Sequence, residues 1–394
     1  MPLPTRARAA AALAVAVLAG CAADPGDAAE DPSPTPHGYV EGAEETAEAQ
    51  WRLVVADAGT GEVHLLDPAT EESVVVATVD DPRQAASDGR YAYVSDGSGT
   101  RVIDGGTWTV DHGDHVHYYK SEPRDVGTVD AAVSAAVGDP AVTVLNAGHG
   151  VVPLDRESLD AGEIATTGSV EAQAAVPYGQ RLIAIDGGAV RVLERDGSGG
   201  DELAKDCPEP QSPTVTRRGA VFACEDGVLL VTGDDELTAE KIPYPAGESL
   251  DGGLHHRPGT SVLAARSDGG GALVLDLKER EWTALDWTAD DTAANGAADA
   301  VAVTATGEDA PVLVLTRDGV LRSFDPATGA PLAQTALLTV ADGSTPVIEA
   351  DTARAYVSDP GGGAVHEIDY RDDLRLARTF DLGFTPGPMA ATGW

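Results

Sequence analysis

Three of the nine histidines in this chain lie in one short stretch, DHGDHVHYYK, at residues 111–120. They are His112, His115 and His117, with Asp114 between them. Imidazole is the most common metal ligand among side chains, and three imidazoles with a carboxylate or water complete a tetrahedral Zn²⁺ site. The stretch therefore predicts a metal site whose ligands are His112, Asp114, His115 and His117.

The spacing within this stretch explains how the side chains would meet. Residues two apart in a strand point to the same side, so His115 and His117 present neighbouring imidazoles. His112 would reach them from a turn. The alternative is a half-exposed polar strand that holds no metal. Nitrogen and oxygen ligands without a thiolate suit Zn²⁺, and also Cu²⁺ or Ni²⁺.

A repeated pattern of short strands supplies the elements that position these residues. Eight segments join an apolar strand to a turn with Gly and an acidic or amide residue, as in LVVADAG from Leu53 and YAYVSDG from Tyr91. Repeats of about 40 residues that each supply four short strands are typical of β-propeller blades. The sequence predicts an all-β fold, a β-propeller of eight blades, with seven as the alternative if a degenerate repeat near Val142 is misassigned.

The two ends of the repeat array complement each other. The first copy, at Leu53, has no innermost strand before it, whereas GPMAA near residue 390 has no strand after it. We therefore expect a ring closed by N- and C-terminal strands in one blade. In the second blade, HVHYYK is predicted as the outermost strand. The stretch GGLHH is predicted as the inner strand of another blade, which makes His255 and His256 candidates for an additional ligand.

The amino-terminal segment has the pattern of an exported lipoprotein. A basic start and a short apolar run end in LAGC at Cys21, which resembles a bacterial lipobox. We expect residues 1–20 to be a lipoprotein signal peptide and Cys21 to be lipidated, so that a lipid anchor alone holds the protein at the extracytoplasmic face of the cell membrane. The alternative is an ordinary signal peptide. Residues 21–50, acidic and rich in Pro, are expected to form a flexible tether, and residues 51–394 the propeller domain.

With Cys21 assigned to the lipid, Cys207 and Cys224 remain as a pair. In an oxidising compartment such a pair predicts a disulfide, which would stabilise the domain by about 3 kcal/mol in the chain-entropy model. The alternative, two thiolates on a metal, lacks further Cys or His residues at ligand spacing.

The chain is strongly acidic, with 65 Asp and Glu residues, 26 Lys and Arg residues and a formal net charge of -39. A phosphate backbone would be repelled, which excludes nucleic-acid binding. The acidity favours solubility outside the cell.

An exported propeller that carries HGDHVHYYK, with PHGYVEGAEE before its first strand, resembles the zinc metallochaperones of Azt-type ABC zinc importers. The similarity covers essentially the whole mature chain. It implies a periplasmic protein that binds Zn²⁺ and delivers it to the zinc-specific solute-binding protein of the importer. The resemblance also implies that His112, His115 and His117 hold the zinc with Asp114, and that His37 and Glu41 form a looser accessory site.

Other functions remain as alternatives. The chain shows no nucleophile elbow and no Ser-His-Asp arrangement, so we predict no catalytic residues and no enzymatic activity. A metal-free interaction scaffold is the first alternative, because propellers commonly serve in that way. A zinc-dependent hydrolase or lactonase is the second. The protein is expected to be a monomer.

Overall fold

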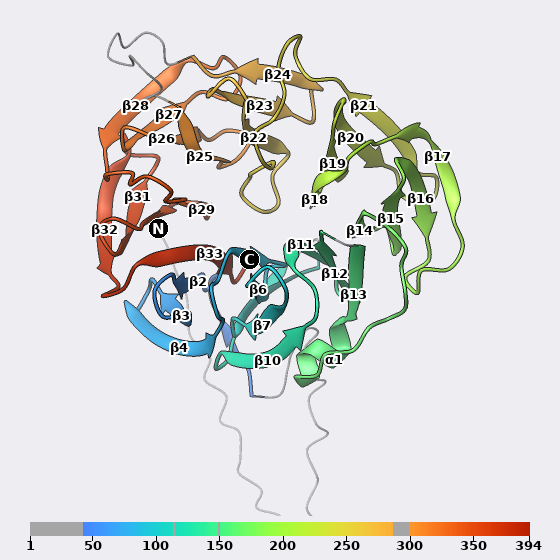
Figure 1. The fold of residues 1–394 in the computed structure, drawn as a ribbon, viewed down its shortest axis with the longest axis horizontal. Coiled ribbons are helices and arrows are strands. Elements are labelled where there is room, and N and C mark those ends of the chain that lie inside the picture. Colours follow the sequence, from blue (N-terminus) through green and yellow to red (C-terminus); the bar gives the residue numbers. More distant parts are fainter. Residues whose placement is uncertain (1–41, 113–114, 149, 287–298) are drawn as a thin grey trace, which may run out of the picture. The chain divides into compact units, whose positions relative to one another are not determined.

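The short apolar strands of the chain assemble into antiparallel sheets (Figure 1). The computed structural model describes residues 42–112, 115–148, 150–286 and 299–394, all of which belong to one compact unit, Gly38–Trp394. The described residues contain a single helix, α1 (Arg156–Ala161), of 6 residues. Within these ranges no helix has the length and apolar character needed to span a membrane.

Eight sheets of three or four strands follow one another along the described chain, as is typical of β-propeller blades. The first has the order β33 (Pro386–Thr392), β2 (Arg52–Asp57), β3 (Glu62–Asp67) and β4 (Glu72–Thr78). The second consists of β5 (Gln84–Ser87), β6 (Tyr91–Ser95), β7 (Thr100–Asp104) and β10 (Arg124–Val129). The third consists of β11 (Val133–Gly138), β12 (Val142–Ala147) and β13 (Gly150–Asp155). The fourth consists of β14 (Ala174–Tyr178), β15 (Arg181–Asp186), β16 (Ala189–Leu193) and β17 (Asp201–Asp206).

The remaining sheets repeat this order. The fifth consists of β18 (Gln211–Thr216), β19 (Gly219–Cys224), β20 (Gly227–Thr232) and β21 (Thr238–Ile242). The sixth consists of β22 (Val262–Arg266), β23 (Ala272–Asp276) and β24 (Glu281–Ala284). The seventh and eighth are β25 (Ala300–Ala305), β26 (Val312–Thr316), β27 (Val320–Phe324) and β28 (Pro331–Ala336), then β29 (Ile348–Ala350), β30 (Ala355–Asp359), β31 (Ala364–Asp369) and β32 (Arg375–Asp381). A further small sheet has the order β1 (Glu44–Thr46), β9 (Val116–Lys120) and β8 (Thr107–Asp111).

Burial follows the position of a strand within its sheet. Every residue of the second strands β2, β6, β19 and β26 is buried, whereas most residues of the outer strands β4, β17 and β28 are exposed. Apolar clusters lie between consecutive sheets; Ile183 and Phe222 share one, and Val54 and Ala92 share another. The inner strands are therefore apolar on both faces, because both faces pack against neighbouring sheets.

β33 pairs with β2 from Arg52 opposite Thr392 onward, so strands from both ends of the described chain share one sheet. The segment 252–256 lies at the predicted inner position, beside β22, but it does not form a regular strand. The backbones of His255 and Ala264 exchange two hydrogen bonds, of 2.7 and 2.9 Å. His255 and His256 make only isolated bridges, to Ala264 and Ala305 respectively, and the sheet that begins at β22 has three strands.

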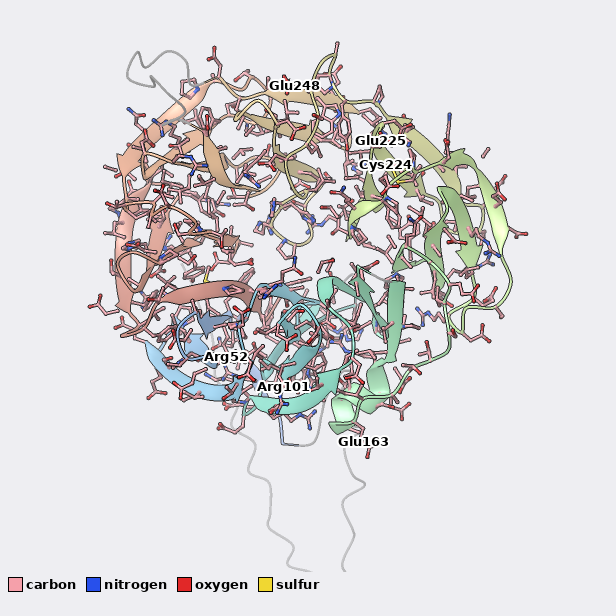
Figure 2. The ribbon with its side chains drawn as sticks, in the orientation of Figure 1. Arg52, Arg101, Glu163, Cys224, Glu225 and Glu248 are labelled. Carbon is pink, nitrogen blue, oxygen red and sulfur yellow. A yellow bond between two sulfur atoms is a disulfide. The ribbon has the colours of Figure 1, made fainter. Side chains whose placement is uncertain are left out.

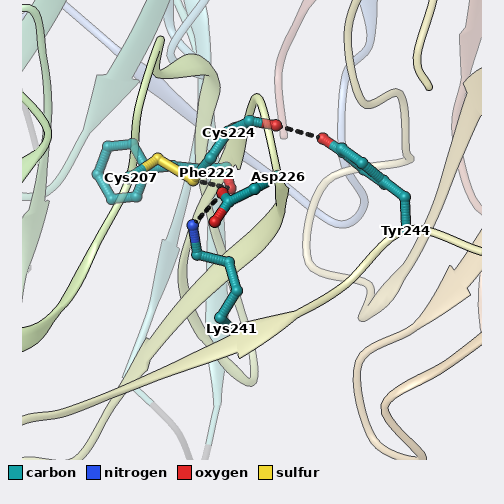
Figure 3. Close-up of a disulfide and its surroundings, with 6 residues drawn as sticks. All are labelled: Cys207, Phe222, Cys224, Asp226, Lys241 and Tyr244. Atoms are coloured by element: carbon teal, nitrogen blue, oxygen red, sulfur yellow. Dashed lines mark hydrogen bonds and ion pairs between the residues drawn. A yellow bond between two sulfur atoms is a disulfide. The ribbon is translucent and has the colours of Figure 1, made fainter.

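A disulfide joins Cys207 to Cys224, the pairing that the sequence predicts (Figure 3). Cys207 follows β17 and Cys224 ends β19, so the bond links two consecutive sheets, with the Cα atoms 5.1 Å apart. The hydroxyl of Tyr244 donates a hydrogen bond of 2.8 Å to the carbonyl oxygen of Cys224. Disulfides are typical of proteins that fold in an oxidising compartment.

The innermost strands line a cavity of about 1870 Å³. Its wall includes residues of β5, β11, β14, β18, β25, β29 and β33. Glu349, in the middle of β29, lines this cavity and is half-buried. Burial raises the pKa of the Glu349 carboxyl to about 8, so the folded protein holds this side chain protonated at neutral pH.

Replacing Glu349 by Gln should stabilise the protein at pH 8 and have little effect at pH 4.5. The folded state keeps a proton on Glu349 up to about pH 8, whereas the unfolded chain releases it near pH 4.5, the ordinary pKa of a glutamate. Between these values the folded state binds more protons, so the stability of the wild type falls as the pH rises. Melting temperatures of both proteins at the two pH values measure this effect. Glu171→Gln, at an exposed carboxyl that also lines the cavity, is the control. An equal rise in the melting temperature of Glu349→Gln at both pH values would contradict the prediction.

Candidate metal centre

HVHYYK is not the outermost strand of its sheet, and that prediction is wrong. Residues 116–120 of this stretch form β9, which pairs with β8 in a hairpin inserted between β7 and β10. β10 takes the outermost position and pairs with β7. β9 pairs with its neighbour in sequence, β8, because the loop that joins the two strands is short. A short loop loses little chain entropy on closure.

The register of this hairpin brings the three histidines to one face. Val110 lies opposite His117, and the backbone N–H of His112 donates a 2.9 Å hydrogen bond to the carbonyl oxygen of His115. Directly opposed residues of an antiparallel pair share a face, and so do residues two apart on one strand. His112 and His115 are thus cross-strand neighbours, with His117 next to them along β9.

The imidazoles are close enough to bind one ion. The ring centroids lie 4.9 Å apart for His112 and His115, 5.4 Å for His112 and His117, and 4.9 Å for His115 and His117. One ring nitrogen from each lies within 4.8 Å of the others. Tetrahedral zinc with Zn–N bonds of about 2.0–2.1 Å needs nitrogens about 3.3 Å apart, which small side-chain rotations would provide. His112 and His115 are exposed and His117 is half-buried, so an ion held here would be accessible to a second protein.

Among the residues that the structure describes, this trio is the single group of three or more His, Cys, Asp or Glu side chains that could hold a metal. The predicted carboxylate ligand, Asp114, lies outside the described residues, as do Cys21, His37 and Glu41. Their assignments stay predictions.

The pair His255 and His256 does not join the trio, and both residues line the cavity instead. Both ring nitrogens of His256 already have partners, the carbonyl oxygen of Arg257 at 2.9 Å and the hydroxyl of Thr214 at 3.1 Å. Burial lowers the pKa of His255 to about 4, which keeps that imidazole neutral. Hydrogen bonding accounts for His256 without a metal.

A stack of charged and aromatic side chains packs against the β8–β9 hairpin. The guanidinium of Arg90 lies 3.9 Å from the centre of the Trp108 ring on β8, and Trp108 stacks on Tyr119 of β9 at 5.4 Å. Tyr119 in turn stacks on His117 at 6.1 Å. Cation–π and aromatic contacts of this kind favour one orientation of the rings, so the stack connects the second sheet to His117.

The base of the hairpin is fixed by Arg52 of β2 (Figure 2). Its Nη1 donates hydrogen bonds to the carbonyl oxygens of Gly105, at 2.7 Å, and Ser121, at 3.2 Å, which flank the hairpin on either side. Gly106 has φ +70, and a Cβ there would lie 2.5 Å from the carbonyl oxygen of Ser121. Only glycine can occupy this position without strain. The chain at Gly106 and the chain at Ser121 can therefore approach each other closely beside Arg52.

The third strand of the small sheet comes from the segment predicted to be a tether. Residues 21–50 carry that prediction, whereas the structure places β1 at Glu44–Thr46 and pairs it with β9. Glu45 lies opposite Tyr119, and its Oε1 is 2.7 Å from Nδ1 of His117. Sequence reasoning missed Glu45 as a site residue, although it belongs to the PHGYVEGAEE stretch on which the resemblance was based.

Comparison with known proteins supports the fold. No protein-family model and no curated protein sequence matches the chain. The crystal structure of AztD from Citrobacter koseri is similar, with a TM-score of 0.72 and 18% identity over 88% of this chain and 99% of that chain. The structure of apo AztD from the same organism gives a TM-score of 0.72 and 17% identity over the same shares. At this level of identity the likeness concerns the fold.

Proposed function

Since this chain has an AztD-type fold, we propose that it is an extracytoplasmic zinc metallochaperone. It binds Zn²⁺ through His112, His115 and His117 and delivers it by ligand exchange to the solute-binding protein of an ABC zinc importer. Asp114 or a water completes the tetrahedral ligand set. The observation that carries this proposal is the gathering of three imidazoles at the exposed end of a hairpin.

Ligand exchange accounts for why the site is exposed. In direct transfer, a ligand from the receiving protein binds the ion before a ligand of the donor leaves, so the ion never enters solution. Such a step needs a site that a partner can reach, unlike the closed four-ligand sites that stabilise zinc fingers. The hairpin end meets this requirement, since two of its three histidines are exposed.

The architecture and location belong to the same proposal. The eight sheets are eight blades of one propeller, closed where β33 joins β2; the sheet order and that pairing support this arrangement. The lipobox-like ending at Cys21 supports a lipid anchor at the extracytoplasmic face, and the disulfide Cys207–Cys224 agrees with an oxidising compartment. The protein acts as a monomer and catalyses no reaction.

A transfer experiment tests the proposal. Zinc-loaded protein is mixed with the zinc-free solute-binding protein, and the metal on each is followed by fluorescence or by mass spectrometry. In a parallel sample a dialysis membrane separates the two proteins. We expect transfer to be much faster when the proteins can touch. Equal rates in the two samples would show that zinc passes through solution and would overturn the proposal.

A further inference from the structure

Strand β1 holds a carboxylate against one of the three histidines, and it reaches that position from a distant part of the sequence. β1 pairs with β9 through three residues, Glu44, Glu45 and Thr46. Glu45 lies opposite Tyr119 and therefore shares the face of the sheet that carries Tyr119 and His117. Its Oε1 lies 2.7 Å from Nδ1 of His117.

This contact determines which nitrogen of His117 faces a metal. A carboxylate accepts hydrogen bonds, so the contact places the proton of the imidazole on Nδ1, which donates to Glu45. The lone pair of Nε2 is then directed away from β1 and is available to an ion. Histidines that bind metals commonly donate their second N–H to a carboxylate, which fixes the ring and increases its basicity.

The strand that carries Glu45 is weakly held. β1 is three residues long, Glu44 and Glu45 are exposed, and within the described residues no further strand pairs with its outer edge. Short segments with little buried apolar surface open at low free-energy cost, well below that of unfolding the domain. β1 can therefore leave β9 while the β8–β9 hairpin stays in place, since the hairpin is fixed at its base by Arg52.

We infer that Glu45 is a positioning residue of the zinc site and that β1 is a detachable part of that site. This inference rests on the proposed function. When β1 is docked, Glu45 holds His117 in the orientation that binds zinc; when β1 leaves, the affinity falls and the ion becomes easier to transfer. Because coupling between two binding events is reciprocal, zinc must also favour the docking of β1.

Three variants of the full chain test the affinity half of this inference. Glu45→Ala should weaken zinc binding by about 10- to 100-fold, the range typical of carboxylates that support a metal ligand. Glu45→Gln should have a smaller effect, because its amide oxygen still accepts from Nδ1. Glu44→Ala is the matched control, since Glu44 is the exposed neighbour on the same strand, opposite Lys120, and its loss should leave affinity unchanged. Competition with a zinc chelator measures the affinities.

Hydrogen exchange tests whether zinc favours the docking of β1. In the wild type, zinc should slow amide exchange in residues 42–50, and in Glu45→Ala this effect of zinc should disappear. A residue with a merely structural role would not produce a zinc-dependent change at this strand. If Glu45→Ala binds zinc as tightly as the wild type, or if the amide exchange rate at β1 does not change with zinc, the inference is overturned.

The outcomes separate this inference from the proposed function. A wild-type protein that binds no zinc, or that binds it equally well without the three histidines, contradicts the zinc-site proposal itself. A wild-type protein that binds zinc through the histidines, together with normal binding by Glu45→Ala, contradicts only the role of Glu45 and β1.

Discussion

Replacing His112, His115 and His117 together by alanine is expected to abolish stoichiometric zinc binding. The three rings supply every described side-chain ligand of the site, so no comparable set is left to hold the ion. Each single replacement should weaken binding by more than the roughly 10- to 100-fold that is typical for loss of a supporting carboxylate, because a direct bond to the metal is lost. Isothermal titration of the purified protein with Zn²⁺ measures both effects.

The fold should survive these changes. His112 and His115 are exposed and His117 is half-buried at a hairpin, so the melting temperature without zinc should change little. His255→Gln is the control for a histidine elsewhere in the chain, because His255 lines the cavity and lies outside the trio. Full zinc binding by the triple variant, or its loss in His255→Gln, would place the metal site elsewhere.

Asp104→Ala is expected to lower the free energy of unfolding by about 3–5 kcal/mol, the usual cost of breaking a buried ion pair. The Asp104 side chain is 2% exposed and that of Arg90 is 3% exposed. Arg90 donates to the Asp104 carboxylate from Nε at 3.1 Å and from Nη2 at 2.9 Å. Removal of the carboxylate leaves the buried guanidinium without this bidentate partner.

The same substitution should also weaken zinc binding, because Asp104 reaches the hairpin in two ways. It accepts a hydrogen bond of 3.0 Å from the backbone N–H of Gly106, at the start of the hairpin, and it fixes Arg90 beneath Trp108. Chemical denaturation and zinc titration of the variant measure the two effects.

Asp125→Ala is the matched control for Asp104. Asp125 lies on β10 in the same sheet and pairs with Arg101, and both side chains of this pair are about a third exposed. Figure 2 labels Arg101. Exposed pairs contribute at most about 1 kcal/mol, so this loss should be small. Equal destabilisation by the two substitutions would show that the buried network around Asp104 has no special role.

The repeat pattern predicted the buried second strands of the sheets well because it is a local property. The apolar stretches at Leu53 and Tyr91 became β2 and β6, both entirely buried. The complementary ends of the array predicted the partners β2 and β33. The outermost strand of the second sheet, β10, was missed because alternation alone cannot say with which strand a segment pairs.

The histidines and Glu45 of the candidate site also differ in how far the sequence could predict them. His112, His115 and His117 lie within six residues, so the two-residue period of a strand for His115 and His117, with a turn that brings His112 back to them, was enough to predict that they meet. Glu45 is 72 residues away in sequence from His117 and lies in a segment whose composition predicts a tether. Its place beside His117 depends on the open edge of β9, which exists only once the hairpin has formed.

The pairing of β33 with β2 also constrains the order in which the molecule can fold. β2, β3 and β4 are made early, but their sheet lacks its innermost strand until residues 386–392 have been synthesised and have left the ribosome. Until then β2 presents an unpaired edge and apolar faces, the features that promote aggregation of incomplete chains. A chain with this connectivity completes its first sheet only after synthesis has ended, when the two distant strands can join.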